Sequence, residues 1–158
     1  LNEVSSHLQQ KNVVKGVVQL LEENAALKKQ AEAFEDIQRQ QEKERWKAAI
    51  ASSGDYKRLI VKTELSPKDV KSLLFQLKQE FDDLVAIVGT AYGDKPNISV
   101  LVSDKLIEPY DLNAAKLVKQ LAKEIHGGGG GQPFFASAGG SNVAGLSIAL
   151  NEASKLIS

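Results

Sequence analysis

The chain has 158 residues, no net charge and a hydrophobic share of 42%. This length suits one medium-sized domain with an appendage, and the domain can form a core without disulfides. The absence of cysteine excludes a disulfide framework, a thiol nucleophile and a thiolate metal site. No apolar run reaches the roughly 20 residues of a membrane span, and zero net charge confines any attraction for nucleic acid to a local patch.

Residues 1–53 are predicted to form a helical arm. Up to residue 50 they contain no proline and one glycine, and they are rich in Glu, Lys, Gln and Ala. We expect residues 1–9 to end a short helix and residues 13–49 to form one long helix of about 50 Å. The stretch 38–47 is polar on all sides, which predicts a solvent-exposed spacer.

Apolar residues recur along the arm at alternating steps of three and four. This heptad pattern predicts a coiled-coil seam that is regular up to Phe34. Asn24 falls where a buried polar side chain can set the register. Pairing with another helix and an amphipathic helix lying on a neighbouring domain both stay open. The candidate oligomerisation residues are Val17, Leu20, Asn24, Leu27 and Phe34.

Residues 54–158 are predicted to form an α/β (α+β) globular domain of order β-α-β-β-α-β-α with a mixed sheet. The expected strands are 56–65, 84–88, 97–102 and 134–138, the second of them buried on both faces because it is continuously apolar. Ser66, Pro67 and Asp69 predict the capped start of the first helix. The second helix is expected at 111–125, and the last is expected to begin at a Ser141 cap.

Five consecutive glycines, Gly127 to Gly131, form the most unusual run. A flexible linker is excluded, because the 27 residues after it are too few to fold alone. Each glycine costs roughly 0.5–1 kcal/mol relative to alanine where a side chain would be tolerated. The run must therefore serve positive φ angles or a close approach to the backbone. It has no Gly-Lys of a Walker loop and lacks the Rossmann glycine spacing, which argues against ATP or NAD.

Anion capture by backbone N–H groups is the function that the glycine run then favours. Gly139-Gly140-Ser141-Asn142 leads into the last predicted helix, whose first amides and partial positive charge attract phosphate. The lysines at 116, 119 and 123 share one helix face and could extend such a patch. The alternative is that Lys116, Lys119 and Lys123 only form a solvated helix face.

Residues 126–140 read His-Gly-Gly-Gly-Gly-Gly-Gln-Pro-Phe-Phe-Ala-Ser-Ala-Gly-Gly. This pattern resembles the signature of the C-terminal domain of alanyl-tRNA synthetases, a domain also attached to DHH-type phosphoesterases. The resemblance extends over the whole chain, with the long helix in the place of the connector after the editing domain. The chain begins at Leu1 and contains no methionine, so we expect a part of a longer polypeptide; a lost or modified methionine is the alternative.

The resemblance implies a parent enzyme that joins alanine to its tRNA with ATP and clears mischarged tRNA in a separate editing domain. This C-terminal part would bind tRNA, and in the family it often self-associates. The partners implied are tRNA, the rest of the synthetase and a second copy, in the cytoplasm and with no membrane. ATP, Mg and Zn would belong to the parent, with no cofactor in this fragment. The binding residues carried over are Gly127, Gly128, Gly129, Gly130, Gly131, Pro133, Ala136, Ala138, Gly139 and Gly140, to which the anion hypothesis adds Ser141 and Asn142.

One position departs from the family pattern. The family often has a basic residue after the glycines, and this chain has Gln132, followed shortly by Phe134 and Phe135. We expect both rings to belong to the core. Stacking of a base or sugar on an exposed ring is the alternative.

No catalytic constellation is visible. The histidines, His7 and His126, are far apart in sequence, and neither an Asp-His-His triplet nor a His-x-x-x-His motif occurs. The acidic pairs 22–23 and 82–83 are interpreted as solvated faces. Two alternatives to a tRNA-binding module stay open. One is a coiled-coil assembly module in which the glycines only permit tight packing, and the other is the nucleic-acid-binding domain of a DHH-type phosphoesterase.

Overall fold

A computed structural model describes residues 13–158 of the chain. The helix expected at residues 1–9 lies outside the described residues. The chain divides into two units, the first ending at Gln41 and the second running from Glu42 to Ser158. The second unit thus contains residues 42–53 in addition to the domain predicted at 54–158.

Helix α2, Val13–Ala49, is continuous and confirms the long helix predicted from the arm's composition. The spacer predicted at 38–47 is wrong, because Trp46 is fully buried in the core of the second unit. The indole Nε1 donates to Glu42 Oε2 at 3.0 Å, and the same oxygen accepts from Thr63 Oγ1 at 2.9 Å. A single tryptophan can bury 150–250 Å², so one large ring anchors a helix end that is otherwise polar.

A six-stranded mixed sheet confirms the predicted fold class. Its spatial order is β1-β2-β3-β4-β6-β5. Strands β2 and β3 are parallel, joined by a helix, and all other neighbours are antiparallel. The strand bounds are β1 Ala51–Ser53, β2 Tyr56–Thr63, β3 Leu84–Tyr92, β4 Lys95–Val102, β5 Gly128–Gly131 and β6 Phe135–Gly139.

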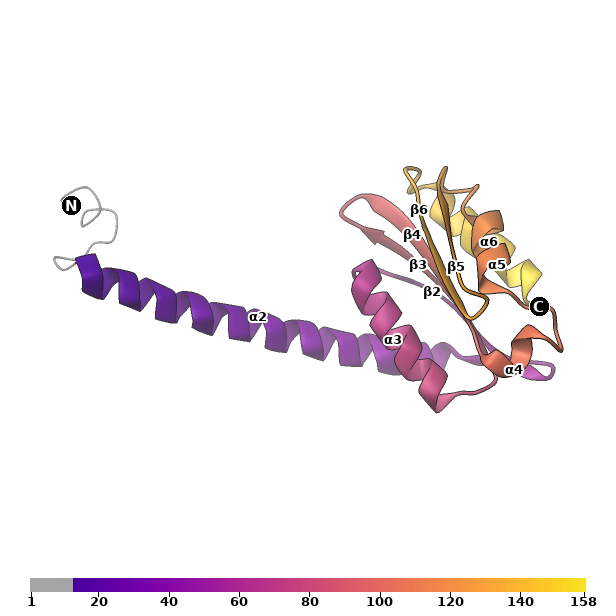
Figure 1. Ribbon diagram of the computed structural model, residues 1–158, viewed down its shortest axis with the longest axis horizontal. Coiled ribbons are helices and arrows are strands. Elements are labelled where there is room, and N and C mark those ends of the chain that lie inside the picture. The colour runs from indigo at the N-terminus through magenta and orange to yellow at the C-terminus, as the bar shows by residue number, and fades with distance from the viewer. Residues whose placement is uncertain (1–12) are drawn as a thin grey trace. The chain divides into compact units, whose positions relative to one another are not determined.

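Helices cover both faces of this sheet (Figure 1). Helix α3, Pro67–Glu80, packs on one face, and α5, Ala114–Leu121, with α6, Gly145–Leu156, packs on the other; the short α4 spans Asp104–Ile107. Strand β3 supplies both cores: Val85 and Ile87 face α5 and α6, whereas Ala86 and Val88 face α3. The prediction of a central strand buried on both faces is confirmed. No helix in residues 13–158 is long and apolar enough to cross a membrane.

The helix starts test the capping predictions. Ser66 caps α3 by accepting from the Asp69 amide at 3.2 Å, as predicted. The helix expected at 111–125 is shorter: it begins after Asn113, whose Oδ1 accepts from two amides of the first turn, and ends at Leu121. The Ser141 cap is wrong, because α6 begins four residues later, at Gly145.

Candidate nucleic-acid interface

The glycine run forms the edge strand β5 rather than a loop. Gln132 and Phe135 exchange backbone hydrogen bonds of 2.8 and 3.2 Å, which closes a hairpin with β6. Hydrogen-bonded and non-bonded pairs alternate along an antiparallel ladder. The N–H and C=O groups of Gly129 and Gly131 therefore point to the open edge, where no strand of residues 13–158 pairs with them.

Every second glycine of the run lies too close to the backbone of the neighbouring segment to carry a side chain. A Cβ on Gly129 would lie 2.1 Å from the Ser137 carbonyl oxygen, far inside van der Waals contact. The opposite holds at Gly128 and Gly130, where a Cβ would meet nothing within 4 Å. The positions crowded by the backbone of the neighbouring segment are Gly127, Gly129 and Gly131. Tight packing thus accounts for three of the five glycines and leaves two open.

The amides predicted to capture an anion beside the last helix already have partners. Those of Ser141 and Asn142 both donate to the Ile125 carbonyl at 2.9 Å, and that of Gly140 donates to Pro96. A Cβ on Gly140 would lie 2.2 Å from the Ile125 oxygen, so this glycine permits the close approach. The Ile125 carbonyl, which follows α5, thus accepts from two of these amides, and the Pro96 carbonyl of β4 accepts from the third. A donor-rich concavity at Gly140–Asn142 is therefore not formed.

Two of the three predicted lysines are on the solvent face of α5, and the third follows the helix. Lys116, Lys119 and Lys123 are all exposed, whereas Val118 and Leu121 of α5 point into the core. Helix α5 packs against β5, so the structure brings the lysine helix and the glycine strand together. Lys116 Nζ also lies 3.4 Å from an oxygen of Asp111.

Phe134 and Phe135 are both half-buried. Phe135 packs against the core cluster that lies under α3, as predicted, whereas Phe134 belongs to neither core cluster, so the prediction of a core role is wrong for Phe134. Phe75 of α3, which sequence reasoning missed, meets both: its ring centroid lies 6.5 Å from that of Phe134 and 5.3 Å from that of Phe135. We call these three rings the aromatic platform. Lys78 Nζ lies 4.7 Å from the Phe134 centroid and Lys71 Nζ 5.4 Å from that of Phe135.

The loop that carries Phe134 is anchored at both of its residues. The Pro133 carbonyl accepts from the Ala114 amide at the start of α5, and the Phe134 carbonyl accepts from the Val102 amide at the end of β4, each at 2.9 Å. These hydrogen bonds connect the tip of the β5–β6 hairpin to α5 and β4. The aromatic platform is therefore held in place by backbone as well as by ring contacts.

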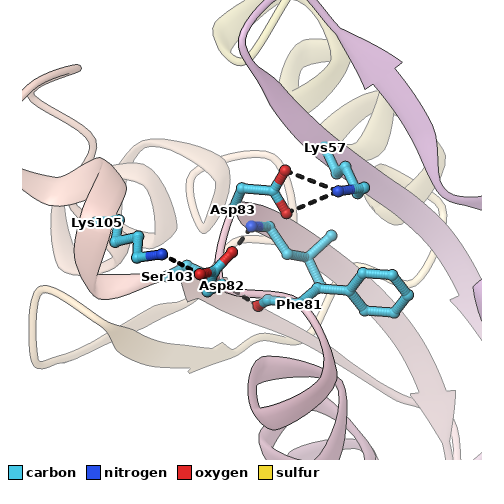
Figure 2. A network of polar contacts seen from close by, with 7 residues as sticks. Lys57, Phe81, Asp82, Asp83, Ser103 and Lys105 are labelled. Atoms are coloured by element: carbon cyan, nitrogen blue, oxygen red, sulfur yellow. Dashed lines mark hydrogen bonds and ion pairs between the residues drawn. The ribbon is translucent and has the colours of Figure 1, made fainter.

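A polar network joins the start of β3 to the end of β4 (Figure 2). The Ser103 hydroxyl accepts from the Leu84 amide at 3.0 Å and donates to the Phe81 carbonyl at 3.2 Å. Lys105 pairs with Asp82, and this hydrogen bond is the main cause that lowers the pKa of the Asp82 carboxyl. A pocket of about 260 Å³ adjoins the network and is lined by Lys78, Asp82, Ser103, Asp104 and Lys105.

The network is made of hydrogen bonds and ion pairs between neighbouring elements. Its aspartates are matched by lysines, as in the 2.7 Å ion pair of Lys57 with Asp83. Among residues 13–158, no group of three or more His, Cys, Asp or Glu side chains could hold a metal ion.

Comparison with known proteins identifies the family. The profile of the DHHA1 domain matches residues 54–158. Alanine–tRNA ligases of Christiangramia forsetii and Cytophaga hutchinsonii are 40% and 35% identical to the chain over 99% and 93% of its length. The chain spans only 18% and 17% of those relatives.

A solved structure shares the fold. The C-Ala domain of Aquifex aeolicus alanyl-tRNA synthetase superposes with a TM-score of 0.61 at 24% identity, covering 68% of this chain and 96% of that domain. The profile match, the alignments with alanine–tRNA ligases and this shared fold together confirm the resemblance to the C-terminal domain of alanyl-tRNA synthetases that was stated from residues 126–140. On this profile match and these alignments, the chain belongs to the DHHA1 domain family.

Proposed function

We propose that this chain is the tRNA-binding C-terminal part of an alanine–tRNA ligase. The observation that carries the proposal is the 40% identity to such a ligase over 99% of the chain, because it covers the arm and the globular unit together. Alanine ligation with ATP and Mg, editing and a zinc site would then belong to the rest of that protein. A cytoplasmic location and a partnership with the remaining domains follow from the same proposal.

The proposed phosphate contact is the open edge of β5. The outward amides of Gly129 and Gly131 are donors without side chains beside them, which lets a phosphate approach the backbone closely. Lysines 116, 119 and 123 on and after the adjoining α5 would add cationic attraction. Gly127, Gly139, Ser141 and Asn142 are proposed only to shape this region, since their amides or Cα atoms are engaged in close packing or hydrogen bonds.

A substitution that tests this contact must leave the fold intact, so it is placed at Gly128 rather than at Gly129. Aspartate at Gly129 would collide with β6, whereas aspartate at Gly128 has open space. We expect Gly128→Asp to fold and to weaken binding of a tRNA(Ala) transcript at least tenfold, because its carboxylate repels the phosphates beside the edge. The measurement is a fluorescence-anisotropy titration at two salt concentrations, with circular dichroism to check folding.

A matched control adds the same charge elsewhere. Asn151 is exposed on α6, and Asn151→Asp should change the affinity less than twofold. Unchanged affinity and salt dependence in Gly128→Asp would remove the β5 edge as the contact. Failure of the unmodified chain to bind tRNA with a salt-dependent affinity would remove the proposed function itself.

The arm supports a second candidate function, self-association. Several of its apolar side chains are strongly exposed, among them Leu20 at 48%, Leu27 at 65% and Phe34 at 60%. Isolated helices derive little stability from propensity alone, and a heptad seam buries such residues against a second helix. We propose that this seam pairs two copies of the chain, a role that does not exclude tRNA binding.

Charges placed in the seam test this pairing. The double variant Leu20→Lys with Leu27→Lys should be monomeric in sedimentation equilibrium at concentrations where the unmodified chain dimerises, because two buried ammonium groups would face each other in each layer. Ala26→Lys with Ala33→Lys adds the same charge at exposed positions outside the seam and should still dimerise. A monomeric unmodified chain at high concentration would exclude the pairing.

A further inference from the structure

The three rings of the aromatic platform come from α3, the β5–β6 loop and the first residue of β6, and all are partly exposed. Lys71, Phe75 and Lys78 follow one another at helical steps of four and three, so they share one side of α3. The side chains of Phe75, Phe134 and Phe135 are each only partly buried. Two ammonium groups lie within the roughly 6 Å at which a cation is attracted to an aromatic face. Rings and cations thus form one surface.

We infer that the aromatic platform is a base-stacking surface for RNA, with Lys71 and Lys78 contacting the phosphates of the stacked nucleotides. The inference rests on the proposed tRNA binding and names a second contact for it, separate from the glycine edge. An unstacked nucleobase would lie on the exposed ring surface of Phe134 and Phe135. The two lysine side chains would turn their ammonium groups from the rings to the neighbouring phosphates.

The chemistry of the surface favours RNA over a protein partner. Interfaces between proteins are depleted of lysine at their cores, since an ammonium group is costly to desolvate there. Proteins that bind unpaired nucleic acid combine aromatic rings for stacking with cations along the backbone. This surface has both in one place.

The anchoring of the loop adds to the affinity of such a surface. Both carbonyls of the Pro133–Phe134 loop are held by backbone hydrogen bonds of 2.9 Å. The backbone of this loop therefore loses little conformational freedom when a base binds, which lowers the entropic cost of binding. Lys78 Nζ also forms an ion pair with Asp104 at 3.0 Å.

Phe134→Leu tests stacking directly in the full chain. It keeps an apolar side chain outside both cores but removes the aromatic face. We expect the dissociation constant for a tRNA(Ala) transcript to rise about tenfold, from the typical contribution of one base–aromatic stack. Lys71→Gln should lower the slope of log affinity against log salt by about one phosphate contact.

Phe81→Leu is the matched control. Phe81 is another partly buried ring with a lysine 5.7 Å above its centroid, Lys57, but it lies outside the platform. It should bind tRNA as the unmodified chain does. A ring-specific readout comes from NMR of the chain labelled in its phenylalanine rings: adding tRNA should shift the Phe134 and Phe135 resonances upfield, with Phe81 unchanged.

The outcomes separate this inference from the proposed function. If the unmodified chain binds tRNA but Phe134→Leu, with its folding verified by circular dichroism, binds equally well and the ring resonances do not move, the platform is not an RNA contact and the tRNA-binding proposal stands. If the unmodified chain does not bind tRNA, both fall. Weakened binding in Phe134→Leu together with upfield ring shifts supports the inference.

Discussion

Replacing Gly129 with alanine is expected to lower the free energy of unfolding by about 3 kcal/mol, at the upper end of typical overpacking costs. The new Cβ would lie 2.1 Å from the Ser137 carbonyl oxygen and 2.5 Å from the Ala138 Cα, both backbone atoms that cannot rotate away. The edge strand would have to separate from β6. Urea denaturation followed by circular dichroism measures the change.

Gly130→Ala is the control for this prediction. It is one residue along the same strand, its Cβ would meet nothing within 4 Å, and its φ lies outside the left-handed region. Its stability should stay within about 1 kcal/mol of the unmodified chain, because alanine only restricts the unfolded state there. Equal stabilities for the two variants would show that β5 does not pack on β6 as described.

Removal of the Trp46 side chain is expected to cost about 3–5 kcal/mol of stability. The ring is fully buried against α3 and the sheet, and its loss leaves a cavity as well as Glu42 without its indole donor. Trp46→Ala should therefore shift the urea midpoint strongly to lower concentration. Since Trp46 is the only tryptophan in the chain, the transition is followed by circular dichroism rather than by fluorescence.

Trp46→Phe separates packing from the polar contact. It retains most of the apolar volume but loses the hydrogen bond to Glu42, whose cost is typically about 1 kcal/mol. Its stability should lie between those of the unmodified chain and Trp46→Ala. A midpoint for Trp46→Ala equal to that of the unmodified chain would contradict the burial of this helix end in the second unit.

Local patterns predicted most of the elements. The composition and the apolar heptad pattern of the arm predicted a helix with the bounds of α2, and Ser66 with Pro67 predicted the start of α3. The continuous apolar run at 84–88 predicted β3, which extends further to Tyr92, and the strand predicted at 97–102 is β4, which begins two residues earlier at Lys95. These signals are local, because hydrophobic period and capping depend on residues a few positions apart.

Predictions from the sequence were wrong where a single residue decided the burial of a segment, or where a strand or helix depended on contacts with a distant segment. Trp46 is a single large apolar residue in the polar stretch 38–47. The polar composition of that stretch therefore predicted solvent exposure, although the Trp46 side chain is fully buried. Four glycines have low strand propensity, yet they form β5 because β6 offers a ladder. Asn113 competes with Asp111 as a helix start, and only the observed amide contacts distinguish them.

The sequence by itself determined the family, through the glycine and Ala-x-Ala-Gly-Gly pattern, and the mixed α and β composition of the fold. The tertiary structure alone decided that the glycine run is an edge strand, that three of its glycines are needed for close packing, and that the amides of Ser141 and Asn142 already have hydrogen-bond acceptors. It also assembled the aromatic platform from residues 59 and 60 positions apart. Backbone clashes and ring contacts between distant segments depend on how strands pair in space, and no local period in the chain records that pairing.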